Sequence, residues 1–217
     1  MKGLFVTGTD TGVGKTVISA ALMSAFDEAH YWKPVQSGSE EDDDTLTVQT
    51  LSGAASSRCW NHGVRLTLPA SPHHAAEVEG RTISMDDILA HLPSGTGPWV
   101  VEGAGGLFVP ISRSVLLPEL IKTLDLPVLV VASTRLGTIN HSLLTLHALR
   151  TLGIKVIALV LNGKRDPSAV SGIASYAESV PLIEMPETEE LRPEYVHRLG
   201  HVLRQSAQIT TAIIKGS

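Results

Sequence analysis

Four short runs of apolar residues recur along the chain, at residues 4–6, 99–101, 128–132 and 156–161. Apolar side chains are nearly continuous within these runs, and Val, Ile and Leu predominate. Strands that alternate in polarity keep one face in water, whereas continuous apolar strands are covered on both faces. The pattern therefore predicts buried parallel strands.

Segments with the apolar spacing of helices separate and follow these runs. They cover residues 16–29, 85–92, 116–124, 139–152 and 195–214. Ser84 and Asp87 resemble a capping box at the start of the second helix, and Gly153 is placed to cap the fourth. Residues 39–44 and 164–170 are rich in charged and turn-forming types, and we expect loops there.

The alternation of strands and helices predicts an α/β fold, with a mostly parallel sheet flanked by helices on both faces. No composition shift that would mark a linker and no internal repeat occurs in the sequence. We therefore expect residues 1–217 to form a single domain.

The amino-acid composition bears on which binding partners the protein can have. A hydrophobic fraction of 43% indicates a globular chain, and a net charge of −5 disfavours nonspecific nucleic-acid binding. No apolar run approaches the roughly 20 residues of a membrane span, and no signal peptide precedes the first strand. Cys59 is the only cysteine, which excludes an intrachain disulfide. We expect a cytoplasmic protein with neither nucleic-acid nor membrane partners.

The stretch GTDTGVGKT, from Gly8 to Thr16, leaves the first predicted strand and enters the first predicted helix. It resembles the phosphate-binding loop GxxxxGKS/T, with one extra residue after Gly8. In such a loop backbone N–H groups and the helix dipole surround phosphate oxygens. Lys15 would contact the β- and γ-phosphates, and the Thr16 hydroxyl would bind Mg²⁺. The loop therefore predicts a phosphate-binding site, and the alternative is a glycine-rich turn between strand and helix that binds no ligand.

Two further stretches place charged residues beside strand ends. Lys33 precedes Pro34, which favours extended backbone, so it is either aimed into a phosphate-rich cleft or a surface lysine in a turn. Glu102 begins EGAGG after a buried strand, where ligands of open α/β sheets bind. It is placed to approach Mg²⁺, unless the stretch is a flexible turn with a solvated carboxylate.

The sequence pattern leaves the roles of several other polar residues undecided. Among Asp42, Asp43 and Asp44, position alone does not select a second carboxylate for Mg²⁺. Asn162 could bond a base edge or form an Asn-Gly turn. His73, His74 and His141 lack the spacing of zinc ligands, which favours structural or substrate-orienting roles.

Taken together, the motifs resemble the dethiobiotin synthetase family. They are FVTGTDTGVGKT, KPVQSG, SPHHAAEVEG, VEGAGG, LGTINH and VLNG, in the family's order over residues 5–163, and the longer phosphate loop is itself a family trait. The resemblance implies that Thr16, Asp44 and Glu102 hold Mg²⁺. It implies that ATP is bound by Gly12, Val13, Gly14, Lys15, Thr16, Val17, Asp44, Glu102, Gly103, Ala104, Gly105, Asn162, Gly163, Pro186, Glu187 and Thr188.

The same resemblance implies which residues act in catalysis and substrate binding. Lys33, Lys15 and Thr11 would be catalytic, and Ser37 would contact the substrate. Asn140 would reach the substrate carboxylate bound by a partner subunit, because the family's sites lie at a homodimer interface. The implied reaction joins 7,8-diaminononanoate, CO₂ and ATP into dethiobiotin, ADP and phosphate, through a carbamate and its mixed anhydride with phosphate.

Two alternatives remain to be weighed. A nucleotide-dependent switch would bind a protein partner, but the partition-type ATPases carry a second lysine where this chain has Asp10. Amide-forming relatives that act on cobalt-corrin precursors usually have a further glutamine-hydrolysing domain, for which 217 residues leave little room. The sequence favours the synthetase.

Overall fold

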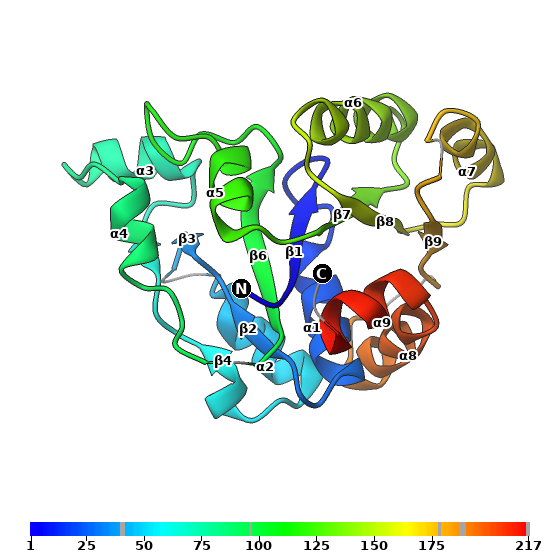
Figure 1. Cartoon of the computed structure of the whole chain (residues 1–217), viewed down its shortest axis with the longest axis horizontal. Helices are drawn as coiled ribbons and strands as arrows, with labels where there is room; N and C mark the ends of the chain where they lie inside the picture. The colour runs from blue at the N-terminus through cyan, green and yellow to red at the C-terminus, as the bar shows by residue number, and fades with distance from the viewer. Residues whose placement is uncertain (40–41, 96, 178, 187–189, 216–217) are drawn as a thin grey trace.

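The structure is a computed structural model that describes residues 1–39, 42–95, 97–177, 179–186 and 190–215 (Figure 1). The strands in these ranges are β1 (Gly3–Gly8), β2 (His30–Trp32), β3 (Val35–Ser37), β4 (Cys59–Trp60), β5 (Val64–Leu66), β6 (Trp99–Gly106), β7 (Val128–Ser133), β8 (Val156–Asn162) and β9 (Leu182–Glu184).

Seven of these strands form one sheet in the order β4-β2-β6-β1-β7-β8-β9, and every neighbouring pair in it is parallel. Strands β3 and β5 form a small parallel pair beside it. The α/β prediction is confirmed. Parallel strands need crossover connections, which accounts for the helices between them.

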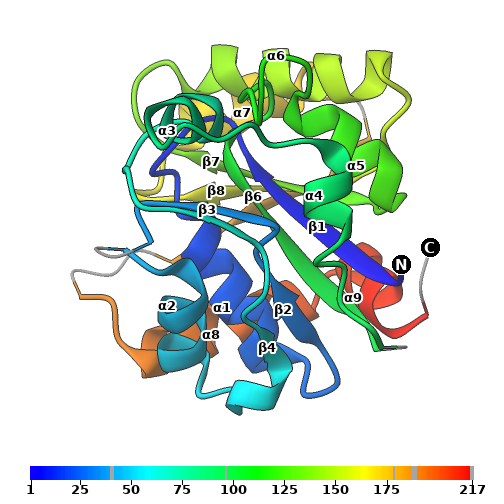
Figure 2. The same ribbon diagram turned by 90° about the vertical axis from the view of Figure 1, so that its left-hand side faces the viewer.

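The helices cover both faces of the sheet (Figure 2). Helices α1, α2, α8 and α9 lie on one face, and α3 to α7 lie on the other, over two separate apolar cores. None of the helices in the described residues is long and apolar enough to cross a membrane. Their bounds are α1 (Lys15–Ala25), α2 (Asp44–Ser52), α3 (Pro72–Val78), α4 (Met85–Leu89), α5 (Leu117–Leu124), α6 (Thr138–Thr151), α7 (Pro167–Ala174), α8 (Pro193–Arg204) and α9 (Ala207–Ile214), with a 3₁₀ turn at Ser56–Arg58.

All four predicted strands are present, and each extends beyond its apolar run at the carboxyl end. Strand β6 continues through the glycines to Gly106, so Glu102 lies inside a strand and the turn considered for this stretch is wrong. Backbone hydrogen bonds between neighbouring strands continue beyond the buried residues, and they extend each strand toward the carboxyl end of the sheet. The strands of two or three residues, such as β4 and β9, are too short to show periodicity.

Several predicted boundaries are corrected. The segment 164–170 is a loop only to Asp166, whose side chain accepts from two backbone N–H groups and starts α7 at Pro167. Helix α1 ends at Ala25, and α4 ends at Leu89 after its predicted capping box. The segment 195–214 is two helices, because Ser206 caps the start of α9.

In segment 39–44, residues 40 and 41 lie outside the described residues, and Asp44 is the first residue of α2. Gly153 follows α6 with a φ of 70°, as a glycine after a helix does.

Strand β1 lies at the centre of the sheet, between β6 and β7. Strands β2, β4 and β6 lie on one side of β1. The later strands β7, β8 and β9 lie on its other side, so the strand order reverses at β1. In open α/β sheets such a reversal opens a crevice at the carboxyl ends of the strands. The loop after β1 and the end of β6 both face this crevice.

Candidate functional site

The predicted phosphate loop connects β1 to the first turn of α1. Gly12 and Gly14 have φ values of 70° and 99°, in the left-handed region that glycine adopts without a steric cost. Because Gly14 is the N-cap of α1 and has no side chain, the first N–H groups of the helix stay available to an anion. Lys15 Nζ donates to the carbonyl of Asp10 at 3.3 Å.

Lys15 is 7% exposed. Burial, and then the nearby charge of Lys33, lower the pKa of Lys15. Two ammonium groups close together in a buried site favour an anion between them, since an anion offsets their repulsion. This part of the loop is therefore suited to phosphate.

Thr16, Asp44 and Glu102 meet at the start of α1. The Thr16 hydroxyl lies 2.6 Å from Asp44 Oδ1 and 3.1 Å from Glu102 Oε1. These three residues come from α1, α2 and β6, so only folding brings them together. Two carboxylates and a hydroxyl are hard oxygen ligands of the kind that Mg²⁺ takes alongside water and phosphate oxygens.

No group of three or more His, Cys, Asp or Glu side chains that could hold a metal occurs among the described residues. An ion here would thus rest on two carboxylates, a hydroxyl and the bound nucleotide. That donor set fits Mg²⁺ and does not resemble a zinc site.

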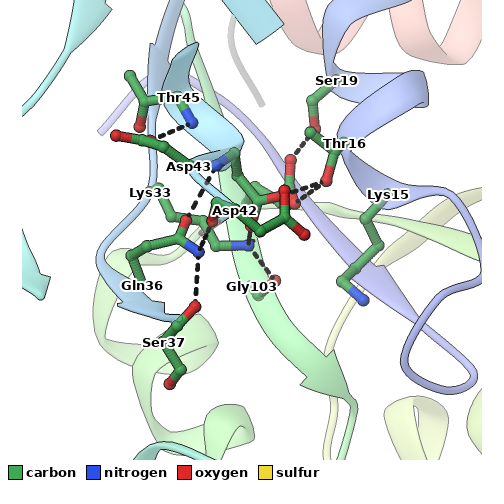
Figure 3. Close-up of polar contacts among 12 residues, drawn as sticks. Lys15, Thr16, Ser19, Lys33, Gln36, Ser37, Asp42, Asp43, Thr45 and Gly103 are labelled. Carbon is green, nitrogen blue, oxygen red and sulfur yellow. Dashed lines mark hydrogen bonds and ion pairs between the residues drawn. The ribbon is translucent and has the colours of Figure 1, made fainter. Parts of the chain in front are cut away.

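Lys33 is paired with the same two carboxylates and donates to the carbonyl of Gly103 (Figure 3). Its Nζ lies 2.7 Å from Asp44 Oδ2, 2.9 Å from Glu102 Oε1 and 3.2 Å from the carbonyl of Gly103. Lys33 is 6% exposed, so the alternative of a surface lysine is wrong.

The ion pair between Lys33 and Asp44 favours the charged form of both groups. Burial acts to lower the pKa of Lys33, but the charges of Glu102 and Asp44 outweigh it, and the pKa is raised from its ordinary value. Burial likewise acts to raise the pKa of Asp44, but the charge of Lys33 and hydrogen bonds from Lys33 and Thr16 lower that pKa.

Glu102 is held by two residues that the sequence motifs did not reveal. Ser19 Oγ donates to Glu102 Oε2 at 2.7 Å, and the Tyr31 hydroxyl donates to the same oxygen at 3.1 Å. Ser19 lies one helical turn after Thr16, a spacing that could have indicated it. Tyr31 pairs in register with Val100, which shares a face of β6 with Glu102. Burial, and then the charge of Glu102, raise the pKa of Tyr31 well above its usual value.

The three neighbouring aspartates, which position alone did not distinguish, take different roles in the structure. Asp44 faces Thr16 and Lys33. Asp43 accepts from the N–H of Thr45, caps α2 and forms an ion pair of 2.5 Å with Arg65. Gln36, which belongs to the KPVQSG motif but had no role assigned from it, bonds the backbone on both sides of Asp43.

Asn162, at the end of β8, contacts the phosphate loop directly. Its Nδ2 donates to the carbonyl of Val13 at 3.0 Å. A Cβ on Gly14 would lie 2.1 Å from the same Nδ2. Asn162 therefore packs against the loop through the space that Gly14 leaves open, and its bond to a base edge stays a prediction.

A cavity of about 650 Å³ opens over these groups. Ser37 lies in its wall, and the Ser37 hydroxyl is buried with no hydrogen-bond partner in the described residues, so it is available to a ligand. The predicted site residues in the wall are Thr11, Gly12, Gly14, Lys15, Thr16, Val17, Lys33, Ser37, Asp44, Ala104 and Gly105.

Several of the other predicted residues that the structure describes are not part of this wall. Asn140 is exposed near the start of α6 and does not line the cavity. Pro186 is exposed, and its carbonyl accepts a hydrogen bond from the Tyr195 hydroxyl. Gly163 follows β8 with a φ of 137°. Glu187 and Thr188 lie outside the described residues.

Solved structures of similar shape carry the same fold at low identity. A ParA family ATPase from Chlorobium tepidum TLS has a TM-score of 0.55 at 15% identity, over 99% of this chain and 98% of that chain. The MinC:MinD cell division complex of Aquifex aeolicus matches with a TM-score of 0.53 at 15% identity, over 99% of this chain and 93% of that chain. These likenesses support the phosphate-loop ATPase fold alone.

The sequence itself has closer relatives. A family model described as an AAA domain matches residues 2–195. An ATP-dependent dethiobiotin synthetase BioD of Rhodopseudomonas palustris (strain BisB5) is 45% identical over 87% of both chains. The protein of the same name from Agrobacterium fabrum is 44% identical over 89% of this chain and 90% of its own. Because the identity extends over most of both sequences, the chain belongs to the family of ATP-dependent dethiobiotin synthetases.

Proposed function

We propose that this protein is an ATP-dependent dethiobiotin synthetase, which closes the cyclic urea of dethiobiotin from 7,8-diaminononanoate and CO₂. One observation carries the proposal: buried Lys33 is paired with two carboxylates that also accept from the Thr16 hydroxyl, at the wall of a cavity that the phosphate loop also lines. The names of the relatives supply the substrate class.

ATP would bind with its phosphates against the backbone of residues 12–17. Lys15 would contact the phosphates, and Asn162 would support the loop from behind through the Val13 carbonyl. Gly163, Pro186, Glu187 and Thr188 would complete the adenine pocket. Thr16, Asp44 and Glu102 would hold Mg²⁺, which neutralises charge on the β- and γ-phosphates when bound.

The reaction has three steps. One amine of the substrate adds to CO₂ and loses a proton, which gives a carbamate. A carbamate oxygen attacks the γ-phosphorus and ADP leaves. The second amine then attacks the carbonyl carbon of the mixed anhydride, phosphate leaves, and loss of a proton completes the urea ring.

Charge is the main obstacle to the second step, because a carbamate and a triphosphate repel each other. Lys33 and Lys15 would offset that charge as it develops, and fixed cations in a site shielded from water do so without reorganisation. Thr11 would assist at the phosphates, since it lines the cavity beside Gly12. The Ser37 hydroxyl would bond the substrate.

We also propose a homodimer in which Asn140 binds the carboxylate of substrate held by the partner subunit. Asn140 is exposed and outside the cavity of its own chain, and Leu136 and Leu144 expose apolar side chains beside it. We further propose that residues 1–217 act as one domain around the continuous sheet, and that the protein works in the cytoplasm, where the free, buried Cys59 stays reduced.

The deciding experiment is mass detection of dethiobiotin formed by purified protein from 7,8-diaminononanoate, bicarbonate and ATP. ADP release should require the diamine and bicarbonate together. A protein that releases ADP equally well without the diamine, and forms no dethiobiotin, would instead be a nucleotide-dependent switch.

A further inference from the structure

Gln36 is a buried amide beside the acidic loop, 4% exposed, and it also lines the cavity. Its Nε2 donates to the carbonyl of Ser37 at 2.8 Å and to the carbonyl of Asp42 at 2.9 Å. Its Oε1 accepts from the N–H of Asp44 at 3.3 Å. Both ends of one side chain are therefore bonded to the backbone on the two sides of Asp43 (Figure 3).

Those hydrogen bonds of Gln36 influence which of the three aspartate carboxylates faces the cavity. Three consecutive aspartates repel one another, and a loop that carried them without internal support could present any of the three. With Asp42 and Asp44 both held at the backbone, Asp43 turns toward Arg65 and caps α2. Asp44 is then left facing Thr16 and Lys33.

The chemistry requires an amide at this position. Two carbonyls need a donor and one N–H needs an acceptor, and a neutral amide supplies both. A carboxylate would keep the acceptor, lose the donor and add a fourth negative charge beside three aspartates. An apolar side chain would leave the carbonyl of Asp42 and the N–H of Asp44 without this partner.

We propose that Gln36 is a positioning residue: it orients the backbone of residues 42–44 so that the Asp44 carboxylate, and not that of Asp42 or Asp43, is presented to the bound metal–nucleotide complex. The inference rests on the proposed function only in that Asp44 binds the metal. Gln36 itself acts through Asp44.

The test compares Gln36→Met, which keeps the length of the side chain, with Gln36→Glu, which keeps size and acceptor. Binding of Mn²⁺ with ATP, followed by electron paramagnetic resonance, reads the metal site without turnover. Loss of these hydrogen bonds should weaken Mn²⁺ binding by about tenfold in Gln36→Met and by more in Gln36→Glu. Saturating Mg²⁺ should restore much of the turnover in Gln36→Met, whereas KM for the diamine changes little.

Gln49→Met, on α2 and outside the cavity wall, is the matched control and should bind Mn²⁺ as wild type does. Binding within twofold of wild type in a folded Gln36→Met or Gln36→Glu protein overturns the inference. A crystal structure of either variant with Asp44 still on Thr16 and Lys33 would also overturn it. If wild type binds Mn²⁺ with ATP but forms no dethiobiotin, the proposed function fails while the role of Gln36 is still decided by these measurements.

Discussion

The ammonium of Lys33 lies 2.7 Å from a carboxylate oxygen of Asp44, and both groups are largely shielded from water. Lys33 follows β2 and Asp44 begins α2, so the pair joins the carboxyl end of a sheet strand to a helix that covers the sheet. The same ammonium also contacts Glu102, the most deeply buried carboxylate of the site. One cation thus balances two acids, and its removal affects both stability and chemistry.

Replacing Lys33 by alanine should lower turnover by roughly 10²-fold or more, the scale of losing one electrostatic stabiliser. It should also lower the free energy of unfolding by roughly 3–5 kcal/mol, because two buried carboxylates lose their partner. Steady-state dethiobiotin formation and urea unfolding measure the two effects. Lys122→Ala, at an exposed position of α5, should change neither. Unchanged turnover in Lys33→Ala would remove its catalytic role.

Two glycines of the phosphate loop should differ sharply in their tolerance of alanine. Both have positive φ, but a Cβ on Gly14 would meet Asn162 at 2.1 Å, whereas a Cβ on Gly12 has nothing within 4 Å. Gly14→Ala should therefore weaken ATP binding far more than Gly12→Ala in calorimetric titrations. The double variant Gly14→Ala with Asn162→Ala should regain part of the loss. Equal losses of ATP affinity in the two single variants would show that backbone strain at positive φ, and not the contact with Asn162, causes the loss.

Tyr31→Phe should destabilise the fold by about 1–3 kcal/mol, because the buried carboxylate of Glu102 loses one of its hydrogen-bond donors. Urea unfolding of the metal-free protein measures the change. Tyr176→Phe removes the same hydroxyl from a side chain that is 73% exposed and should have almost no effect. A Tyr31→Phe protein as stable as wild type would mean that Ser19 and Lys33 hold Glu102 unaided.

Two inactive variants should complement each other if the sites are shared across a dimer. In a mixture of Lys33→Ala and Asn140→Ala subunits, a mixed dimer has one site with its own Lys33 and the partner's Asn140 intact. Random reassociation should restore about one quarter of the wild-type sites, which follows from two-fold symmetry. Activity after unfolding and refolding the mixture measures this. No gain over the separate variants would place Asn140 outside the partner's site.

The capping box of α4 should give a stability difference that depends on pH. Hydrogen bonds from the Ser84 hydroxyl and backbone lower the pKa of Asp87 in the folded protein. A depressed folded pKa stabilises the fold at pH values above the unfolded pKa, and this contribution is lost as pH falls through the folded pKa. Wild type should thus have a higher melting temperature than Asp87→Asn at neutral pH, and the two melting temperatures should converge in acid. A constant difference down to acid pH would contradict this.

Local chemistry made parts of the protein predictable from the sequence. Continuous Val, Ile and Leu runs have no stable position except between two helical layers, so the parallel sheet follows from them. The loop from Gly8 to Thr16 was recognisable because its glycines, lysine and threonine are adjacent in sequence. Ser84 and Asp87 likewise form a cap within one helical turn.

Contacts between distant segments were decided only by the tertiary structure. No local pattern distinguishes Asp44 from its two neighbours, and only the resemblance singled it out, because Gln36 and Arg65, which contact this segment, lie elsewhere in the chain. Tyr31 and Glu102 meet because of the register between β2 and β6, which no local pattern encodes. Short-range preferences along the chain were enough to indicate the layers and the phosphate loop. Strand register and helix packing, which depend on residues far apart in the chain, decided which charges surround the cavity.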